Sequence, residues 1–169
     1  MNKIKISPAL QEEYRSVLTP ELKIGIVLAD FNPKITHRLL LGALEFLHFA
    51  GLQSDQVLLY LVPGALEIPL ICADLCQGKK VNGIVALGAV IRGKTFHFEI
   101  VCMESARGLM DVSLRYHIPI GNSILTCNTH KQALDRSGDR ENNKGWAAAK
   151  TVLDILKVQK TLSLIKACK

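Results

Sequence analysis

The stretch Ile84-Val-Ala-Leu-Gly88-Ala-Val-Ile-Arg-Gly-Lys-Thr-Phe-His97 joins an apolar run, typical of a buried β-strand, to a segment with a helical pattern. A glycine-bearing turn between a strand and a helix presents backbone N–H groups and the positive end of the helix dipole, a combination that binds phosphate. His97 adds an imidazole beside this turn, and imidazole suits proton transfer near neutral pH. The stretch therefore predicts an anion site with an adjacent acid or base, as needed for chemistry on a phosphorylated small molecule.

Similar apolar runs occur before and after this stretch, and each precedes a segment with helical character. The predicted strands cover residues 24–29, 57–62, 84–90 and 118–126, and the predicted helices cover residues 34–50, 65–76, 101–114, 129–136 and 143–164. Strands that alternate with helices predict an α/β fold, here a three-layer αβα sandwich with a four-stranded parallel sheet.

Parallel strands joined by right-handed crossovers end at one edge of their sheet, where ligands bind in such folds. Residues 30–32, 63–67, 91–97 and 127–129 follow the four predicted strands, so that one site could draw on several loops. No partner element is evident for residues 1–22, which we expect to form an arm before a domain of residues 23–169.

The composition is that of an ordinary globular protein. The 169 residues are 49% hydrophobic and 21% charged, a balance that favours one domain with a substantial core. No apolar run approaches the roughly 18 residues of a membrane span. The N-terminal residues lack the apolar core of a signal peptide, so we expect a cytoplasmic protein.

The five cysteines and the net charge of +6 do not point to a metal or to nucleic acid. Cys72 and Cys76 share a helix face, but no histidine or third cysteine lies near them at the spacing of a zinc site, so buried small residues are the favoured interpretation. The excess of positive charge is scattered and few aromatic residues accompany it. A solvated basic surface is therefore favoured over nucleic-acid binding.

An alternative arises because residues 88–95 also fit the P-loop pattern G-x-x-x-x-G-K-[ST]. Three features count against an ATP or GTP site. Val90 and Ile91 favour extended strand over a phosphate cradle, the motif follows the third strand and not the first, and no later strand ends in an aspartate that could hold magnesium.

Other candidates have ordinary structural interpretations. Residues 62–69 place Pro-Gly at a strand end and Glu67 at a helix start, which is either a plain turn or a site for a polar ligand. Phe31 could stack on a planar heterocycle or belong to the core. Arg136 is a surface residue unless the fold, or a neighbouring subunit, brings it to Lys94 and Thr95.

Taken together, these motifs resemble the lumazine synthase family over residues 23–156. The resemblance rests on Phe31-Asn32, on Val62-Pro-Gly-Ala-Leu-Glu-Ile-Pro69, on Gly88-x-Val-Ile-Arg-Gly-x-Thr-x-His97-Phe98, and on later pieces at residues 108–114, 125–126, 132–138 and 143–145. Each piece is modest alone, but their order and spacing together are specific. The resemblance implies a flavodoxin-like fold and an enzyme without cofactor or metal.

The family condenses 5-amino-6-(D-ribitylamino)uracil with 3,4-dihydroxy-2-butanone 4-phosphate to give 6,7-dimethyl-8-ribityllumazine, a step of riboflavin biosynthesis. By resemblance, Phe31 would stack on the pyrimidine and His97 would move protons. The ribityl chain would contact Asn32, Ala65, Leu66 and Glu67, the ring edge would contact Val90 and Ile91, and the phosphate would be held by Lys94, Thr95 and Arg136.

Two residues depart from the family pattern. The family usually has an aromatic residue where Leu66 stands, and it commonly places another at Asn122 to cover the pocket of a neighbouring subunit. Asn122 removes a stacking face or hydrogen-bonds the heterocycle. Neither change touches the phosphate loop or His97, so we expect activity with altered affinity.

The resemblance also implies a homo-oligomer, with pentamers that remain free, pair or close into a sixty-subunit icosahedral shell. The short spacing between Arg136 and Asn143 is similar to shell-forming members, and we favour the shell. Riboflavin synthase is an expected partner, whereas nucleic acid and membranes are not. The arm is expected to pack on a neighbouring subunit. A rival hypothesis is a shell protein that binds lumazine or riboflavin and has lost catalysis.

Overall fold

The computed structural model describes residues 7–167, and the side chains of these residues except 141 and 164–167. Four parallel strands form one sheet in the order β2-β1-β3-β4, where β1 is Ile24–Ala29, β2 is Val57–Val62, β3 is Gly83–Ile91 and β4 is Ile120–Cys127. The register pairs Ile24 with Val57 and with Gly83, and Ile84 with Ile120. This confirms the predicted four-stranded parallel sheet.

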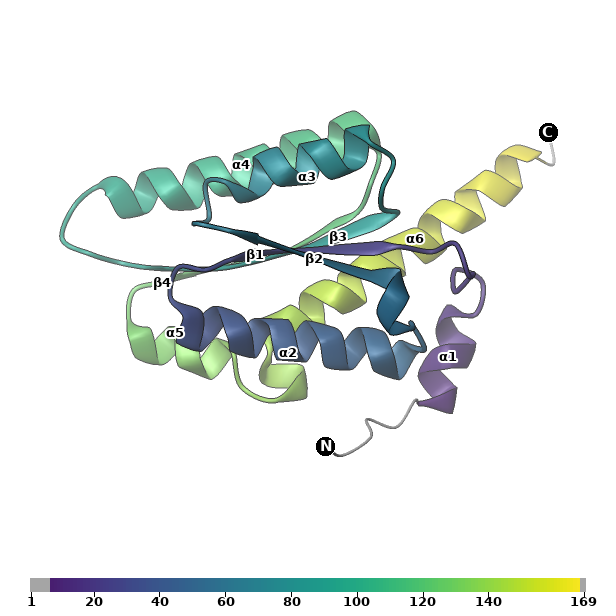
Figure 1. Cartoon of the computed structure of the whole chain (residues 1–169), viewed down its shortest axis with the longest axis horizontal. Coiled ribbons are helices and arrows are strands. Elements are labelled where there is room, and N and C mark those ends of the chain that lie inside the picture. Colours follow the sequence, from purple (N-terminus) through teal and green to yellow (C-terminus); the bar gives the residue numbers. More distant parts are fainter. Residues whose placement is uncertain (1–6, 168–169) are drawn as a thin grey trace.

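Helices cover both faces of the sheet (Figure 1). One face carries α3 (Ile68–Gln77) and α4 (His97–Tyr116), and the other carries α2 (Pro33–Ala50), α5 (His130–Arg136) and α6 (Lys144–Ala167). Short 3-10 helices, η1 (Ser54–Gln56) and η2 (Arg140–Asn142), precede β2 and α6. The two apolar clusters of the core lie on opposite faces of the sheet, so the three-layer prediction is confirmed.

Burial on both faces explains why the strands were visible in the sequence. Every residue of β1 is buried, as expected for an interior strand of a parallel sheet. The predicted bounds of β1 and β2 agree with the structure. The fourth strand begins two residues later than predicted, since Pro119 has no N–H for the ladder, although its carbonyl accepts a hydrogen bond from Ile84.

The starts of two helices differ from the prediction. Residues 65–67 form a turn, and α3 begins at Ile68. Helix α4 begins at His97, four residues before the predicted start. Phe96 occupies its N-cap position and supplies no capping side chain, so the sequence lacks the main signal for a helix start there, although Glu99 lies in the first turn.

Residues 8–22 have partners within their own chain, which the sequence analysis did not anticipate. Helix α1 (Pro8–Tyr14) packs on α2 and α6, and the ring of Tyr14 is fully buried against Phe46. The Tyr14 hydroxyl donates a hydrogen bond to Asp154 of α6 at 2.7 Å. Tyr14 therefore ties this helix to the core, and Leu10 also packs against it.

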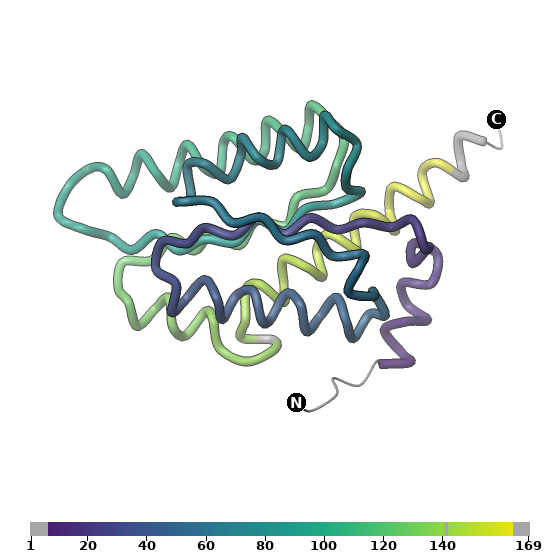
Figure 2. The backbone as a smooth tube through the Cα atoms, viewed as in Figure 1, coloured from purple at the N-terminus to yellow at the C-terminus, as the bar shows by residue number. Residues whose placement is uncertain are grey.

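The long helix α6 crosses beneath β3 and β4 and continues past the sheet (Figure 2). Asn143 caps its first turn, because its Oδ1 accepts hydrogen bonds from the backbone N–H groups of Gly145 and Trp146. Helix and sheet approach closely at Gly121, where a Cβ would lie 2.2 Å from the carbonyl oxygen of Ala148. Only glycine fits at that contact.

Candidate active site

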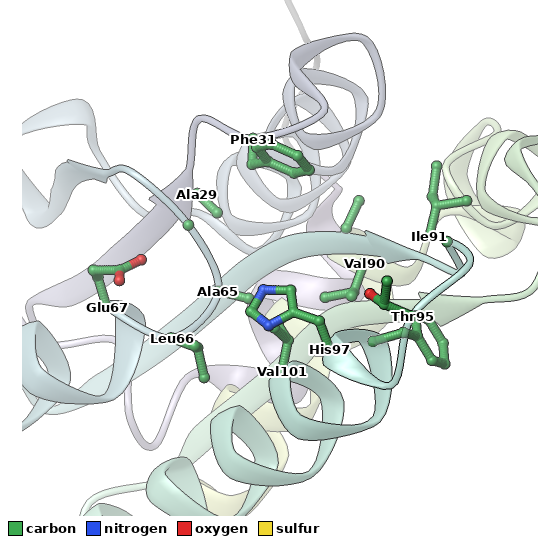
Figure 3. Close-up of a pocket in the computed structure, with 14 residues that line it drawn as sticks. Ala29, Phe31, Ala65, Leu66, Glu67, Val90, Ile91, Thr95, His97 and Val101 are labelled. Atoms are coloured by element: carbon green, nitrogen blue, oxygen red, sulfur yellow. The ribbon is translucent and has the colours of Figure 1, made fainter.

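The loops that follow β1, β2 and β3 meet at the carboxyl edge of the sheet and enclose a cavity of about 480 Å³ (Figure 3). The cavity is lined by Ala29, Phe31, Gly64, Ala65, Leu66, Glu67, Ala89, Val90, Ile91, Gly93, Thr95, His97, Phe98 and Val101. In Figure 3, Phe31 and the imidazole of His97 lie on opposite sides of the opening, with Val90 beside the imidazole. The sheet topology thus gathers three separate motifs into one site.

The loop after β1 is held in an unusual backbone conformation. Asn32 has φ 60° and ψ 53°, in the left-handed region, which asparagine tolerates better than most residues. Its side-chain amide donates a hydrogen bond to the carbonyl of Ala89 at 2.8 Å. Phe31 remains 67% exposed and faces the cavity. The ring is therefore presented to a ligand and not packed in the core.

The turn after β2 forms the opposite wall. Ala65 is buried, whereas Leu66 is 39% exposed and Glu67 is exposed at the N-cap position of α3. A Cβ on Gly64 would lie 3.0 Å from Oε2 of Glu67, so glycine at this position leaves room for the carboxylate. The negative charge lies at the positive end of the helix, an arrangement that stabilises it.

The loop after β3 offers backbone donors to a ligand. Within residues 7–167, the N–H groups of Gly93, Lys94 and Thr95 have no hydrogen-bond acceptor. The loop leads into the 20-residue helix α4, whose first residue is the exposed His97. Unpartnered donors beside a helix N-terminus attract anions, so an imidazole stands next to a site suited to phosphate.

The nucleotide alternative does not agree with this geometry. Strand β3 continues to Ile91, so that the first four residues of the P-loop pattern are extended strand and not a cradle. Gly88 is buried, and a Cβ there would lie 3.3 Å from the side chain of Ile124. The N–H groups of this glycine and its neighbours belong to the sheet ladder and cannot wrap a triphosphate.

Eight of the predicted site residues line the cavity: Phe31, Ala65, Leu66, Glu67, Val90, Ile91, Thr95 and His97. Asn32 borders it through its bond to Ala89, and Lys94 is an exposed residue of the loop after β3. Asn122 and Arg136 lie elsewhere in the chain, in a second cavity of about 340 Å³ between β4 and the helices α5 and α6. One copy of the chain therefore does not bring Arg136 to Lys94 and Thr95.

Six lining residues were not predicted. Ala29 and Ala89 are small residues near the ends of β1 and β3, and Gly64 and Gly93 lie in the loops. Phe98 follows His97, and Val101 lies one helical turn beyond His97 on the same face of α4. That i, i+4 spacing was the signal in the sequence that could have identified Val101.

Cys72 and Cys76 are buried in α3, which confirms the structural interpretation of this pair. Burial raises the pKa of both thiols, so both are protonated at neutral pH. Across the described part of the chain, no three His, Cys, Asp or Glu side chains gather as metal ligands would. No helix within residues 7–167 has the length and apolarity required to cross a membrane.

Comparison with known proteins identifies the family of this chain. The family model for 6,7-dimethyl-8-ribityllumazine synthase matches residues 21–160. The protein of that name from Desulfovibrio desulfuricans is 42% identical over 141 residues, which cover 83% of this chain and 90% of the relative. The one from Levilactobacillus brevis is 40% identical over 149 residues, which cover 88% and 95% of the two chains. This chain belongs to the 6,7-dimethyl-8-ribityllumazine synthase family.

Proposed function

We propose that this protein catalyses the reaction of its family, the condensation of 5-amino-6-(D-ribitylamino)uracil with 3,4-dihydroxy-2-butanone 4-phosphate in riboflavin biosynthesis. The observation that carries the proposal is the composition of the 480 Å³ cavity. It combines an exposed aromatic ring, a loop of unpartnered N–H groups and a histidine directly after that loop. These features match a flat heterocycle, a phosphate and a reaction made of proton transfers.

Each wall of the cavity has a role in this proposal. Phe31 stacks on the pyrimidine, and Val90 and Ile91 contact the edge of the ring. The ribityl chain lies along Asn32, Ala65, Leu66 and Glu67, whose polar groups meet its hydroxyls. The loop around Lys94 and Thr95 binds the phosphate through its backbone N–H groups.

His97 lies where protons must move. The 5-amino group attacks the ketone and water leaves to give an imine. Phosphate is eliminated, the resulting enol tautomerises, and the ribitylamine nitrogen closes the ring with loss of a second water. All of these steps join intrinsically reactive groups, so that holding the substrates together supplies much of the acceleration. A positioned histidine adds about 10²- to 10⁴-fold.

A homo-oligomer would complete the site. Asn122 and Arg136 are both exposed on the edge strand β4 and on α5, outside the cavity of their own chain. Exposed apolar side chains on α4 support association, since Met103, Met110 and Leu114 are each at least 60% exposed. In our proposal a neighbouring subunit places its Arg136 on the phosphate and its Asn122 over the heterocycle, within a pentamer.

Complementation between subunits tests this arrangement. Chains carrying His97→Ala and chains carrying Arg136→Ala would be co-expressed, and native mass spectrometry would verify that mixed oligomers form. If sites lie between subunits, some interfaces carry both native residues, and the mixed oligomers exceed the summed activities of the two pure variants. Activity equal to that sum in verified mixed oligomers would contradict a shared site.

The function itself is tested by lumazine formation, followed by absorbance and fluorescence with both substrates and a no-enzyme control, without metal or nucleotide. Acceleration over the control is expected. Tight lumazine or riboflavin binding without acceleration would instead favour a shell protein that has lost catalysis. The icosahedral shell, the cytoplasmic location and the association with riboflavin synthase stay predictions.

A further inference from the structure

The side chain of Arg92, the first residue after β3, bridges three segments of the chain. Its Nε donates a hydrogen bond to Oδ1 of Asn128 at 2.8 Å, and its Nη1 donates to Oε1 of Glu99 in α4. The guanidinium lies 4.2 Å from the centre of the Phe98 ring. The backbone N–H of Arg92 also donates to the carbonyl of Cys127 at 2.9 Å.

The bridge extends to the helix that carries Arg136. The backbone N–H of Asn128 donates to Oε1 of Gln132 at 2.8 Å. Gln132 forms the capping box of α5 with Thr129. The carbonyl of Gln132 accepts a hydrogen bond from Nη1 of Arg136 at 3.3 Å. Arg92 therefore connects the phosphate loop to the start of α5.

The phosphate loop has little packing of its own. Apart from Gly93 itself and its neighbours Arg92 and Lys94, no described residue has an atom within 4 Å of the position that a Cβ on Gly93 would occupy. Lys94, Thr95 and Phe96 are exposed, and the last is 71% exposed. The position of the loop therefore depends on its two ends, and the contacts of Arg92 anchor the first of them.

The Arg92 charge is already paired within the chain. Its hydrogen bond holds the pKa of Glu99 below the usual range, so the carboxylate stays ionised. Oε2 of Glu99 is buried and has no hydrogen-bond partner among the described residues. A guanidinium that stacks on Phe98 and pairs with this carboxylate has a fixed geometry and reduced charge for an external anion. Arg92 is also absent from the lining of the cavity.

We propose that Arg92 is a positioning residue, which holds the N–H groups of residues 93–95 in place for phosphate through its contacts with Glu99 and Asn128. The inference rests on the proposed function, because it assigns the loop to the phosphate of the substrate. It differs from a direct role, in which the guanidinium itself would bind the phosphate.

Glu99→Gln separates the two roles, because the positioning role predicts a higher KM for butanone phosphate and the direct role predicts a constant or lower one. If Arg92 positions the loop, Arg92→Gln and Glu99→Gln each raise the KM for butanone phosphate about 10-fold and leave the KM for the pyrimidine within about 2-fold. The double variant then has a KM for butanone phosphate no higher than that of Arg92→Gln. If Arg92 bound the phosphate directly, Glu99→Gln would release the guanidinium, and the KM would stay constant or fall. That result would overturn the proposal.

Arg92→Lys adds a second discrimination. Lysine keeps the charge but loses the planar contacts with Asn128, Glu99 and Phe98. Under the proposal it raises the KM for butanone phosphate nearly as much as glutamine does, whereas a wild-type KM would indicate a direct electrostatic role and overturn it. Arg107→Gln is the matched control, since it breaks an ion pair with Glu104 elsewhere on α4 and should leave both KM values unchanged.

Inorganic phosphate provides a readout that does not need turnover. Its dissociation constant, measured by calorimetry, should rise about 10-fold in both Arg92→Gln and Glu99→Gln. If the wild type bound phosphate but formed no lumazine, the proposed function would fail, and the phosphate titrations would still decide the role of Arg92. Should Arg92→Gln not fold, the exposed Asn128→Ala takes its place, and unchanged phosphate affinity in it would overturn the proposal.

Discussion

The side-chain amide of Asn32 donates a hydrogen bond to the carbonyl of Ala89, at 2.8 Å, and so joins the loop after β1 to the end of β3. Asn32 also adopts a left-handed backbone conformation with φ 60°. Together the bond and the conformation direct Phe31, the preceding residue, over the cavity. The position of Phe31, which forms the aromatic wall of the site, therefore depends on Asn32, the next residue in the sequence.

Two substitutions at Asn32 separate these contributions. Asn32→Gly keeps access to the left-handed region but loses the hydrogen bond, at a cost of about 1 kcal/mol in unfolding free energy. Asn32→Ala loses both and should cost about 1–2 kcal/mol more. Both should raise the KM for the pyrimidine, alanine more than glycine. Urea denaturation and steady-state kinetics measure these changes, and equal effects of the two variants would show that the left-handed conformation has no influence.

Tyr14, through its hydrogen bond to Asp154, makes the stability of the folded protein depend on pH. Burial and the hydrogen bond to Asp154 raise the pKa of Tyr14 above its ordinary 10.0. This contribution to stability is complete below pH 10 and is lost as pH rises further. Burial raises the pKa of Asp154, but hydrogen bonds from Lys150 and Tyr14 outweigh it and lower that pKa below 3.8. This second contribution is present above pH 3.8 and is lost as pH falls.

Tyr14→Phe should therefore lower the unfolding free energy by about 1.5 kcal/mol at pH 7. The difference from the wild type should shrink both above pH 10 and below pH 3.8. This difference is measured by urea denaturation at pH 3, 7 and 11, with circular dichroism as the signal for unfolding. A difference that stays constant across this range would contradict the assigned hydrogen bond.

Leu66 is the departure from the family pattern that lines the cavity directly. Leu66→Phe should lower the KM for the pyrimidine about 2- to 5-fold, because the larger side chain buries more apolar surface against the ribityl chain, at about 25 cal/mol per Å². The kcat should change little. Leu70→Phe is the control, since Leu70 is exposed on α3 outside the cavity. An equal response of both variants would argue against contact between Leu66 and substrate.

Strands and layers were accessible from the sequence because buried parallel strands are continuous apolar runs. Because parallel strands end at one edge of their sheet, the sequence also predicted that Phe31, residues 65–67 and His97 lie at that edge, without knowledge of any contact. The start of α4 was missed because Phe96 carries no capping group. The partners of residues 8–22 were missed because a seven-residue helix with one buried tyrosine has little periodicity.

The positions of Asn122 and Arg136 illustrate a different limit. Arg136 belongs to the family pattern and Asn122 departs from it, yet both line another cavity of the same chain. The order of residues in the sequence cannot state whether two side chains near the fourth strand face the cavity of their own chain. The Arg92 contacts were likewise invisible, because they join residues 7 and 36 positions apart.

We propose that lumazine forms in the cavity between Phe31 and His97 and that His97 moves the protons. The most direct test is the kcat of His97→Ala for lumazine formation at saturating substrates, beside His130→Ala, which removes the exposed first residue of another helix, α5. We predict that kcat falls about 10²- to 10⁴-fold in His97→Ala, with folding unchanged, and stays at the wild-type value in His130→Ala. A wild-type kcat in folded His97→Ala would contradict the account.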